Sequence, residues 1–161
     1  MSGELAPAAA RVQAALARQG LDCTVVELPG STRTAEDAAR AVGCRVEQII
    51  KSLVFRGRRT GEPVLVLASG GNRVSEPLVA AIVGEEIERA DPTYVRQRSG
   101  FAIGGVAPIG HPAPIRTIID EDLLKHEVLW AAAGTPHAVF RMTATDLPRM
   151  SSGSIAAIAI R

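Results

Sequence analysis

Apolar positions recur along the chain with two different periods, and the helical period appears first. An N-terminal stripe has spacings of four, three and four residues, which is the spacing of one face of a helix. The stripe consists of Leu5, Ala9, Val12 and Leu16. Pro7 near its start and Gly20 after its end are typical of helix boundaries. A second helix is predicted at residues 34–43, where Thr34 stands as the capping residue.

Short apolar runs between Gly and Pro signals predict seven strands. They lie at residues 23–28, 48–56, 63–69, 114–120, 127–133, 137–142 and 154–160. Further helices are expected at residues 75–84, 91–97 and 143–150, with one helical turn at residues 120–125. The run at 63–69 is apolar on both faces, which indicates a central strand covered on both sides. Because helices and strands interleave, the sequence predicts one α/β domain over residues 1–161, whose mixed sheet curls into a partial barrel with flanking helices.

The composition is that of a globular domain, and it also bears on the cellular compartment in which the protein is expected. Of the 161 residues, 47% are apolar and 22% are charged. No apolar run approaches the roughly 20 residues that span a bilayer, and residues 1–20 do not resemble a signal peptide. We therefore expect a cytoplasmic protein with no membrane partner. Cys23 and Cys44 are interpreted as reduced core residues, and no metal-ligand spacing surrounds the histidines, so neither a metal nor a cofactor is predicted.

The charge pattern leaves two interpretations of one basic segment. A net charge of +1 argues against tight, non-specific nucleic-acid binding driven by the whole protein. Arg56, Arg58 and Arg59 nevertheless lie close together with no acidic residue among them. They are either a solvated strand end with its loop or a binding site for a phosphate chain.

Lys51 is the first candidate for chemistry because it lies within an apolar strand. In a strand it shares a face with Ile49, Leu53 and Phe55. A buried ammonium is costly unless it finds a partner. Lys51 is therefore either an edge-strand lysine that opposes aggregation or a cation at a pocket mouth that grips an anionic or carbonyl oxygen.

The segment GGVAPIGHP at residues 104–112 is the second candidate. Gly104 and Gly105 allow the main chain to approach a ligand closely, and the prolines stiffen the segment. His111 fits a structural hydrogen bond as well as acid–base chemistry. The small residues AAAGT at 131–135 form either a tight pocket wall or ordinary core packing. No phosphate-binding P-loop, GxGxxG or GxSxG motif is present.

The ordered set of these segments resembles the YbaK/prolyl-tRNA synthetase-associated domain family. The matching stretches are RTAEDAARAVGCRVEQIIKSLVFR, PVLVLASGGNRVS, GFAIGGVAPIGH and AAAGTPHAVFRM, within residues 20–160. The resemblance implies a mixed α/β sandwich or partial barrel. It also implies a trans-editing enzyme that hydrolyses the ester joining a wrong amino acid to tRNA, often the tRNA for proline.

The resemblance also assigns roles to residues. It matches Lys51 to the lysine that meets the terminal adenosine or its phosphate, and it places Gly104, Gly105 and His111 in the catalytic loop. We predict substrate contacts for Thr34, Ser52, Ala133 and Gly134, and tRNA contacts for Arg56, Arg58 and Arg59. Some members of the family carry serine where this chain has Ala132.

We therefore expect a deacylase that removes a small amino acid from the tRNA for proline or a related tRNA. Oriented water and main-chain polarisation would take the place of a covalent nucleophile. The main alternative is a non-catalytic module that binds a nucleotide, a tRNA or an aminoacyl-tRNA synthetase, and an unrelated small-molecule hydrolase is the third hypothesis. The sequence leaves the oligomeric state open.

Overall fold

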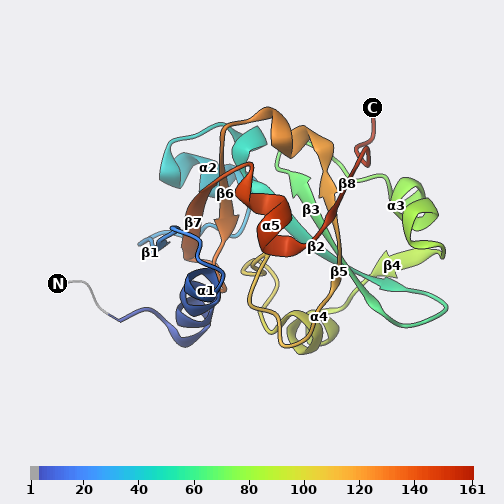
Figure 1. Ribbon diagram of the computed structural model, residues 1–161, viewed down its shortest axis with the longest axis horizontal. Coiled ribbons are helices and arrows are strands. Elements are labelled where there is room, and N and C mark those ends of the chain that lie inside the picture. Colours follow the sequence, from blue (N-terminus) through green and yellow to red (C-terminus); the bar gives the residue numbers. More distant parts are fainter. Residues whose placement is uncertain (1–3) are drawn as a thin grey trace.

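The computed structural model describes residues 4–161 and contains two sheets with helices around them (Figure 1). The larger sheet has the strand order β4-β2-β3-β5-β8 and the smaller one β1-β7-β6. In chain order the strands are β1 Val25–Glu27, β2 Ile50–Gly57, β3 Pro63–Ser69, β4 Ile87–Arg89, β5 Arg116–Asp120, β6 Val128–Ala132, β7 Ala138–Thr143 and β8 Ser154–Ala156. The α-helices are α1 Pro7–Arg18, α2 Ala35–Val42, α3 Glu76–Val83, α4 Pro92–Ser99 and α5 Asp146–Ser151. Two 3₁₀ helices, η1 Val46–Gln48 and η2 Glu121–Lys125, precede β2 and follow β5.

The predicted mixed α/β architecture is confirmed, and its sheets do not close into a barrel. In the larger sheet β2 pairs antiparallel with β3 and β4, whereas β3–β5 and β5–β8 are parallel. The smaller sheet is antiparallel throughout. A single parallel bridge between Ile49 and Trp130 links the start of β2 to β6. The strands therefore form two sheets that meet at one point.

Strand β3 lies at the centre of the core, as its two-sided apolar pattern predicts. Each of its seven residues is buried. Leu65 and Leu67 belong to the larger core cluster, together with residues of α1 and of the smaller sheet. Val66 belongs to a second cluster, with Val79 of α3. Figure 1 shows α1 and α3 at opposite ends of the molecule, so β3 is covered from both sides.

Helix boundaries follow the predicted capping signals, with one exception. The Thr34 hydroxyl accepts a hydrogen bond of 3.0 Å from the Asp37 amide and opens α2, and Gly43 ends it with φ of 75°. The helix predicted from residue 143 begins instead at Asp146, because Thr143 Oγ1 donates to the Asp146 carboxylate and does not cap an amide. Short strand β4 was not predicted, since three residues carry too weak a pattern. Within residues 4–161, no helix combines the length and apolarity needed to cross a membrane.

His111 braces the irregular segment that joins α4 to β5. Its Nε2 lies 2.7 Å from the carbonyl oxygen of Ala107, so this nitrogen carries the proton of the neutral ring. The ring also meets Phe101 edge-on, at 6.3 Å between centroids. Burial lowers the pKa of His111, and the bond to Ala107 opposes that shift. The imidazole is thus built into the fold as a neutral group.

This burial predicts a pH dependence of stability. The folded chain resists protonation of His111, whereas the unfolded chain takes up that proton near pH 6.5. The free energy of unfolding contributed by this group is complete above pH 6.5 and falls as the pH is lowered below that value. Urea unfolding of the wild type and of His111→Gln should show a steeper loss for the wild type, by at most about 1.36 kcal/mol per pH unit. Equal slopes for the two proteins would contradict the assignment.

Candidate functional site

A cavity of about 360 Å³ opens where α2, the start of β2, the glycine-rich segment and the β6–β7 hairpin meet. Its walls include Thr32–Glu36, Ala38 and Val42 on one side and Ile49–Leu53 with Gly70 on another. Ile103, Gly104, Val106, Trp130, Ala131, Ala132 and Val139 complete it. The cavity therefore lies at the junction between the two sheets, beside the Ile49–Trp130 bridge.

The structure brings four predicted site residues together at this cavity, namely Thr34, Lys51, Ser52 and Gly104. Three other predicted site residues do not line the cavity and are buried next to its wall. Gly105, Ala133 and Gly134 are buried, and the Gly134 amide donates to the Gly105 carbonyl over 2.9 Å. A Cβ on Gly105 would lie 2.8 Å from the Thr135 nitrogen, so only glycine allows the loop to approach the hairpin this closely.

Lys51 is partly buried, and its ammonium has one protein partner among residues 4–161. Nζ donates to the main-chain carbonyl of Asn72. Burial lowers the pKa of Lys51, the carboxylates of Glu36 and Asp120 oppose this shift, and Arg73 reinforces it. An ammonium has three N–H donors, so two remain for a ligand in the cavity.

Ser52 contributes an unusual polar atom to the same wall. Its Oγ is buried and has no hydrogen-bond partner within the described part of the chain. Ser52 also lines an adjoining cavity of about 170 Å³, whose other walls include Phe55, Ala90 and Val95. Because a buried hydroxyl without a partner costs about 1–3 kcal/mol, this one is suited to meet a polar group of a ligand.

The glycine-rich segment contributes residues to the same cavity wall as Lys51. Gly104 has φ of 89°, and the Gly105 amide is already used in a turn to Ala102. The amides of Gly104 and Val106, both residues of the cavity wall, have no hydrogen-bond partner in residues 4–161. Such amides can polarise a carbonyl oxygen or stabilise an oxyanion.

His111 lies outside this cavity. It lines a separate shallow hollow with Gln19, Met150 and neighbouring residues of its own segment. Its contact with Ala107 holds the segment in shape, and its predicted catalytic role stays a prediction.

The three predicted tRNA-binding arginines lie in the β2–β3 hairpin, at the end of β2 opposite Lys51. The Arg56 guanidinium lies over the Tyr94 ring, 5.4 Å from its centroid. Arg58 is 3.6 Å from the Glu86 carboxylate, and the Arg59 amide donates to Glu85 over 2.8 Å. The hairpin thus lies against two acidic residues of the segment between α3 and β4.

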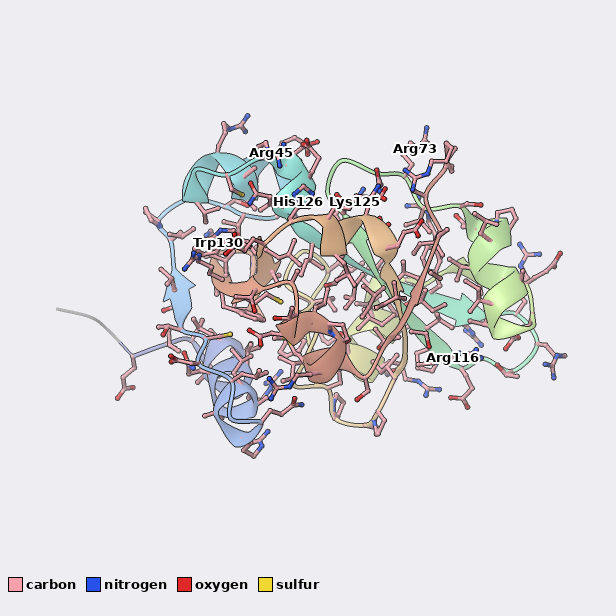
Figure 2. All side chains as sticks on the ribbon, turned by 45° about the horizontal axis from the view of Figure 1, so that its top comes forward. Arg45, Arg73, Arg116, Lys125, His126 and Trp130 are labelled. Carbon is pink, nitrogen blue, oxygen red and sulfur yellow. The ribbon has the colours of Figure 1, made fainter. Side chains whose placement is uncertain are left out.

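Several residues of the site were not singled out from the sequence. Arg33 precedes the helix cap and lines the cavity, and Trp130 covers it from β6. Figure 2 shows Arg45 and His126 side by side near Trp130, with Arg73 further along the same edge. Arg45 Nη2 is 3.3 Å from His126 Nδ1. Trp130 could have been singled out from the sequence, because it is the single tryptophan of the chain.

Comparisons with known proteins find similar folds and related sequences. A solved structure described as a "putative trans-editing enzyme for prolyl tRNA synthetase" superposes with a TM-score of 0.92 and 46% identity, covering 98% of this chain and 100% of that one. The "Putative Cys-tRNA(Pro)/Cys-tRNA(Cys) deacylase EbsC" of Enterococcus faecalis (strain ATCC 700802 / V583) is 23% identical over 78% of this chain and 76% of its own length.

The proline–tRNA ligase of Limosilactobacillus fermentum is 34% identical over 59% of this chain, and the match spans 17% of the ligase. The chain thus corresponds to a small part of that enzyme. Residues 30–150 match the family model of the aminoacyl-tRNA editing domain, and this range includes Lys51, the glycine-rich segment and the β6–β7 hairpin of the cavity. The chain belongs to the aminoacyl-tRNA editing domain family.

Proposed function

We propose that this protein is a trans-editing deacylase that hydrolyses the ester of a mischarged aminoacyl-tRNA. The observation that carries the proposal is the Lys51 ammonium on the wall of a cavity that also presents the Gly104 and Val106 amides. Membership of the editing domain family supports the reaction class. The relatives described as trans-editing and deacylating proteins support it further.

The proposed chemistry needs no covalent nucleophile, because an aminoacyl ester is already activated. Water attacks the acyl carbon, and the bond from this carbon to the ribose oxygen breaks. The products are a free amino acid and an uncharged 3′ end, whose oxygen takes the proton. An amide donor placed at the developing oxyanion contributes on the order of 3 kcal/mol. Lys51 holds the terminal phosphate or ribose, so that the ester stays beside these amides.

A small amino acid suits the proposed site. The adjoining cavity, which Ser52 also lines, has a volume of about 170 Å³ and can receive a short side chain such as that of alanine, serine or cysteine. Binding alone separates side chains that differ by one methylene only about 10–200-fold, which is why a second hydrolytic site is useful. The tRNA for proline is the proposed carrier, because the name of the EbsC relative includes it. Prolyl-tRNA synthetase is the proposed partner, because two similar proteins name it.

A non-catalytic binding module is the competing function. It is favoured by the position of His111 outside the cavity, which leaves Glu36 as the titratable acid or base nearest to Lys51 in the cavity lining. Deacylation assays separate the two functions directly.

The first prediction concerns activity. Assays with a panel of mischarged tRNAs should show hydrolysis of at least one small amino acid, and Lys51→Ala should lower kcat/KM tenfold or more. The reason is that the ammonium fixes the 3′ end of the RNA beside the main-chain donors. Circular dichroism should show an unchanged fold. Full activity in the folded variant would remove Lys51 from the mechanism, and no activity on any tRNA would favour the binding module.

A second prediction concerns the hydroxyl of Ser52. Ser52→Ala should leave the free energy of unfolding unchanged or raise it, because the hydroxyl it removes has no partner in the folded chain. The control Ser99→Ala should cost about 1 kcal/mol, because buried Ser99 donates to the Val95 carbonyl. Ser52→Ala should also slow hydrolysis of serine from tRNA at least fivefold more than that of alanine. Equal slowing would show that Ser52 does not read the substrate side chain.

A third prediction concerns where the RNA lies. Arg33 lines the cavity together with Lys51, and Arg73 lies close enough to lower the pKa of Lys51. Arg58 and Arg59, in contrast, follow the far end of β2, about 20 Å from Lys51 at a strand rise of 3.3 Å per residue. The double variant Arg33→Ala/Arg73→Ala should weaken tRNA binding and reduce the slope of log affinity against log salt by about 0.7–0.9 per lost phosphate contact. Arg58→Ala/Arg59→Ala is the matched comparison. A larger effect of the hairpin variant would place the RNA on the hairpin instead.

A further inference from the structure

We propose that Asn72 is a positioning residue for Lys51. Its side-chain amide is clamped between two carboxylates and thereby fixes the main-chain oxygen that receives the Lys51 ammonium. The effect of Asn72 on catalysis rests on the proposed function. Its effect on the position of Lys51 does not depend on that function.

The oxygen in question belongs to a tight turn that follows β3. Within this turn the Asn72 amide nitrogen donates to the Ser69 carbonyl over 2.9 Å, and the Gly70 amide donates to the Ile49 carbonyl over 2.7 Å. A Cβ on Gly70 would lie 2.3 Å from the carbonyl oxygen of Val46, so the turn is pressed against η1. Lys51 Nζ then donates to the carbonyl of Asn72. The turn thus presents one acceptor to the ammonium.

The side chain of Asn72 ties this turn to the end of β5. Its Nδ2 donates to Asp120 over 2.9 Å and to Asp122 over 2.8 Å. Asp120 is 1% exposed and also accepts from the amides of Ser69 and Asp122. Strands β3 and β5 are parallel neighbours, so their carboxyl ends meet at one edge of the sheet. The contact between Asn72 and Asp120 follows from this topology.

The second carboxylate is fixed in turn by two cations. Asp122 lies 2.8 Å from Arg161 Nη1 and 2.8 Å from Lys125 Nζ. Hydrogen bonds from Arg161, Lys125 and Asn72 hold the pKa of Asp122 well below its usual range. An asparagine suits the place between such anions, because its NH₂ group donates two hydrogen bonds without adding charge.

Two consequences follow for Lys51. One of its three N–H donors is held on a turn that cannot shift without breaking the bonds to both carboxylates, so the direction of the other two is constrained. The nearby charge of Asp120 also favours the protonated form of Lys51 against the effect of burial. The same network therefore places the cation and keeps it charged.

The chain allows a direct measurement because it contains two lysines, Lys51 and Lys125. Lysine-selective ¹³C labelling gives two sets of side-chain NMR signals, which Lys51→Ala assigns. In the wild type the two Hε protons of Lys51 should differ in chemical shift, because the ammonium is held. In Asn72→Ala this difference should fall by at least half. An unchanged difference in a folded Asn72→Ala protein would overturn the proposal.

A matched control removes a similar clamp elsewhere. Gln13 bridges the Cys23 carbonyl and the Val25 amide through hydrogen bonds of 2.9 and 2.8 Å, on the opposite side of the core. Gln13→Ala should lower stability and leave the Lys51 signals unchanged. Where Asn72→Ala does not fold, Asn72→Ser keeps one hydroxyl donor and should reduce the Hε shift difference partway. A wild-type difference in folded Asn72→Ser would count against the proposal.

A double-mutant cycle tests the catalytic consequence. Asn72→Ala should lower kcat/KM for deacylation about tenfold, whereas in the Lys51→Ala background the same change should cost less than twofold. Equal losses in both backgrounds would show that Asn72 acts on stability alone and would overturn its role. If the wild type hydrolyses no mischarged tRNA, the proposed function fails, and the NMR comparison still decides whether Asn72 positions Lys51.

Discussion

The structure of the site depends on keeping one ammonium charged on a partly apolar wall. Lys51 shares its strand with buried residues, and burial lowers its pKa. Such a group persists only when a fixed acceptor and nearby carboxylates offset the lost hydration. The carbonyl of Asn72 is the acceptor, and Glu36 and Asp120 supply the negative charge. The turn after β3 and the end of β5 are therefore part of the site, although neither carries a group that the proposed reaction uses directly.

The cavity exists because the two sheets meet without merging. Had β2 and β6 paired along their length, side chains would fill the junction, but only Ile49 and Trp130 form a bridge. Helix α2 covers the remaining gap, and its small residues, such as Ala35 and Ala38, leave room below it. The glycine-rich segment closes the other side, where Gly105 packs directly on the main chain of the β6–β7 turn. Main chain and short side chains thus form part of the walls, together with larger side chains such as Ile103 and Trp130.

This construction suits a reaction that depends on position more than on a reactive side chain. Serine, histidine and cysteine are the usual nucleophiles or bases of ester hydrolysis. Here Ser52 lines the cavity but its hydroxyl has no hydrogen-bond partner among residues 4–161, and His111 braces its own segment outside the cavity. Main-chain amides of the glycine-rich segment, such as those of Gly104 and Val106, would act without reorganisation during the reaction, which is the property that makes preorganised dipoles effective. The proposed function therefore follows from the same rigidity that shapes the cavity.

Local patterns along the chain were enough to predict most of the helices and strands and several polar residues of the site. The periods of apolar residues predicted α1, α2 and the two-sided strand β3, and the chemical contrast of a lysine in an apolar strand singled out Lys51. The sequence also pointed to Gly104 and Gly105 together, because the wide range of backbone conformations open to glycine is a property of the residue itself. It could not tell that Asn72 and Asp120, 48 residues apart, form one clamp, since only the parallel pairing of β3 and β5 brings them together. The sequence also could not show that His111 lies outside the cavity. It could not show that Glu85 and Glu86 lie next to the β2–β3 hairpin. These outcomes are set by contacts between distant segments, on which local pattern and propensity carry no information.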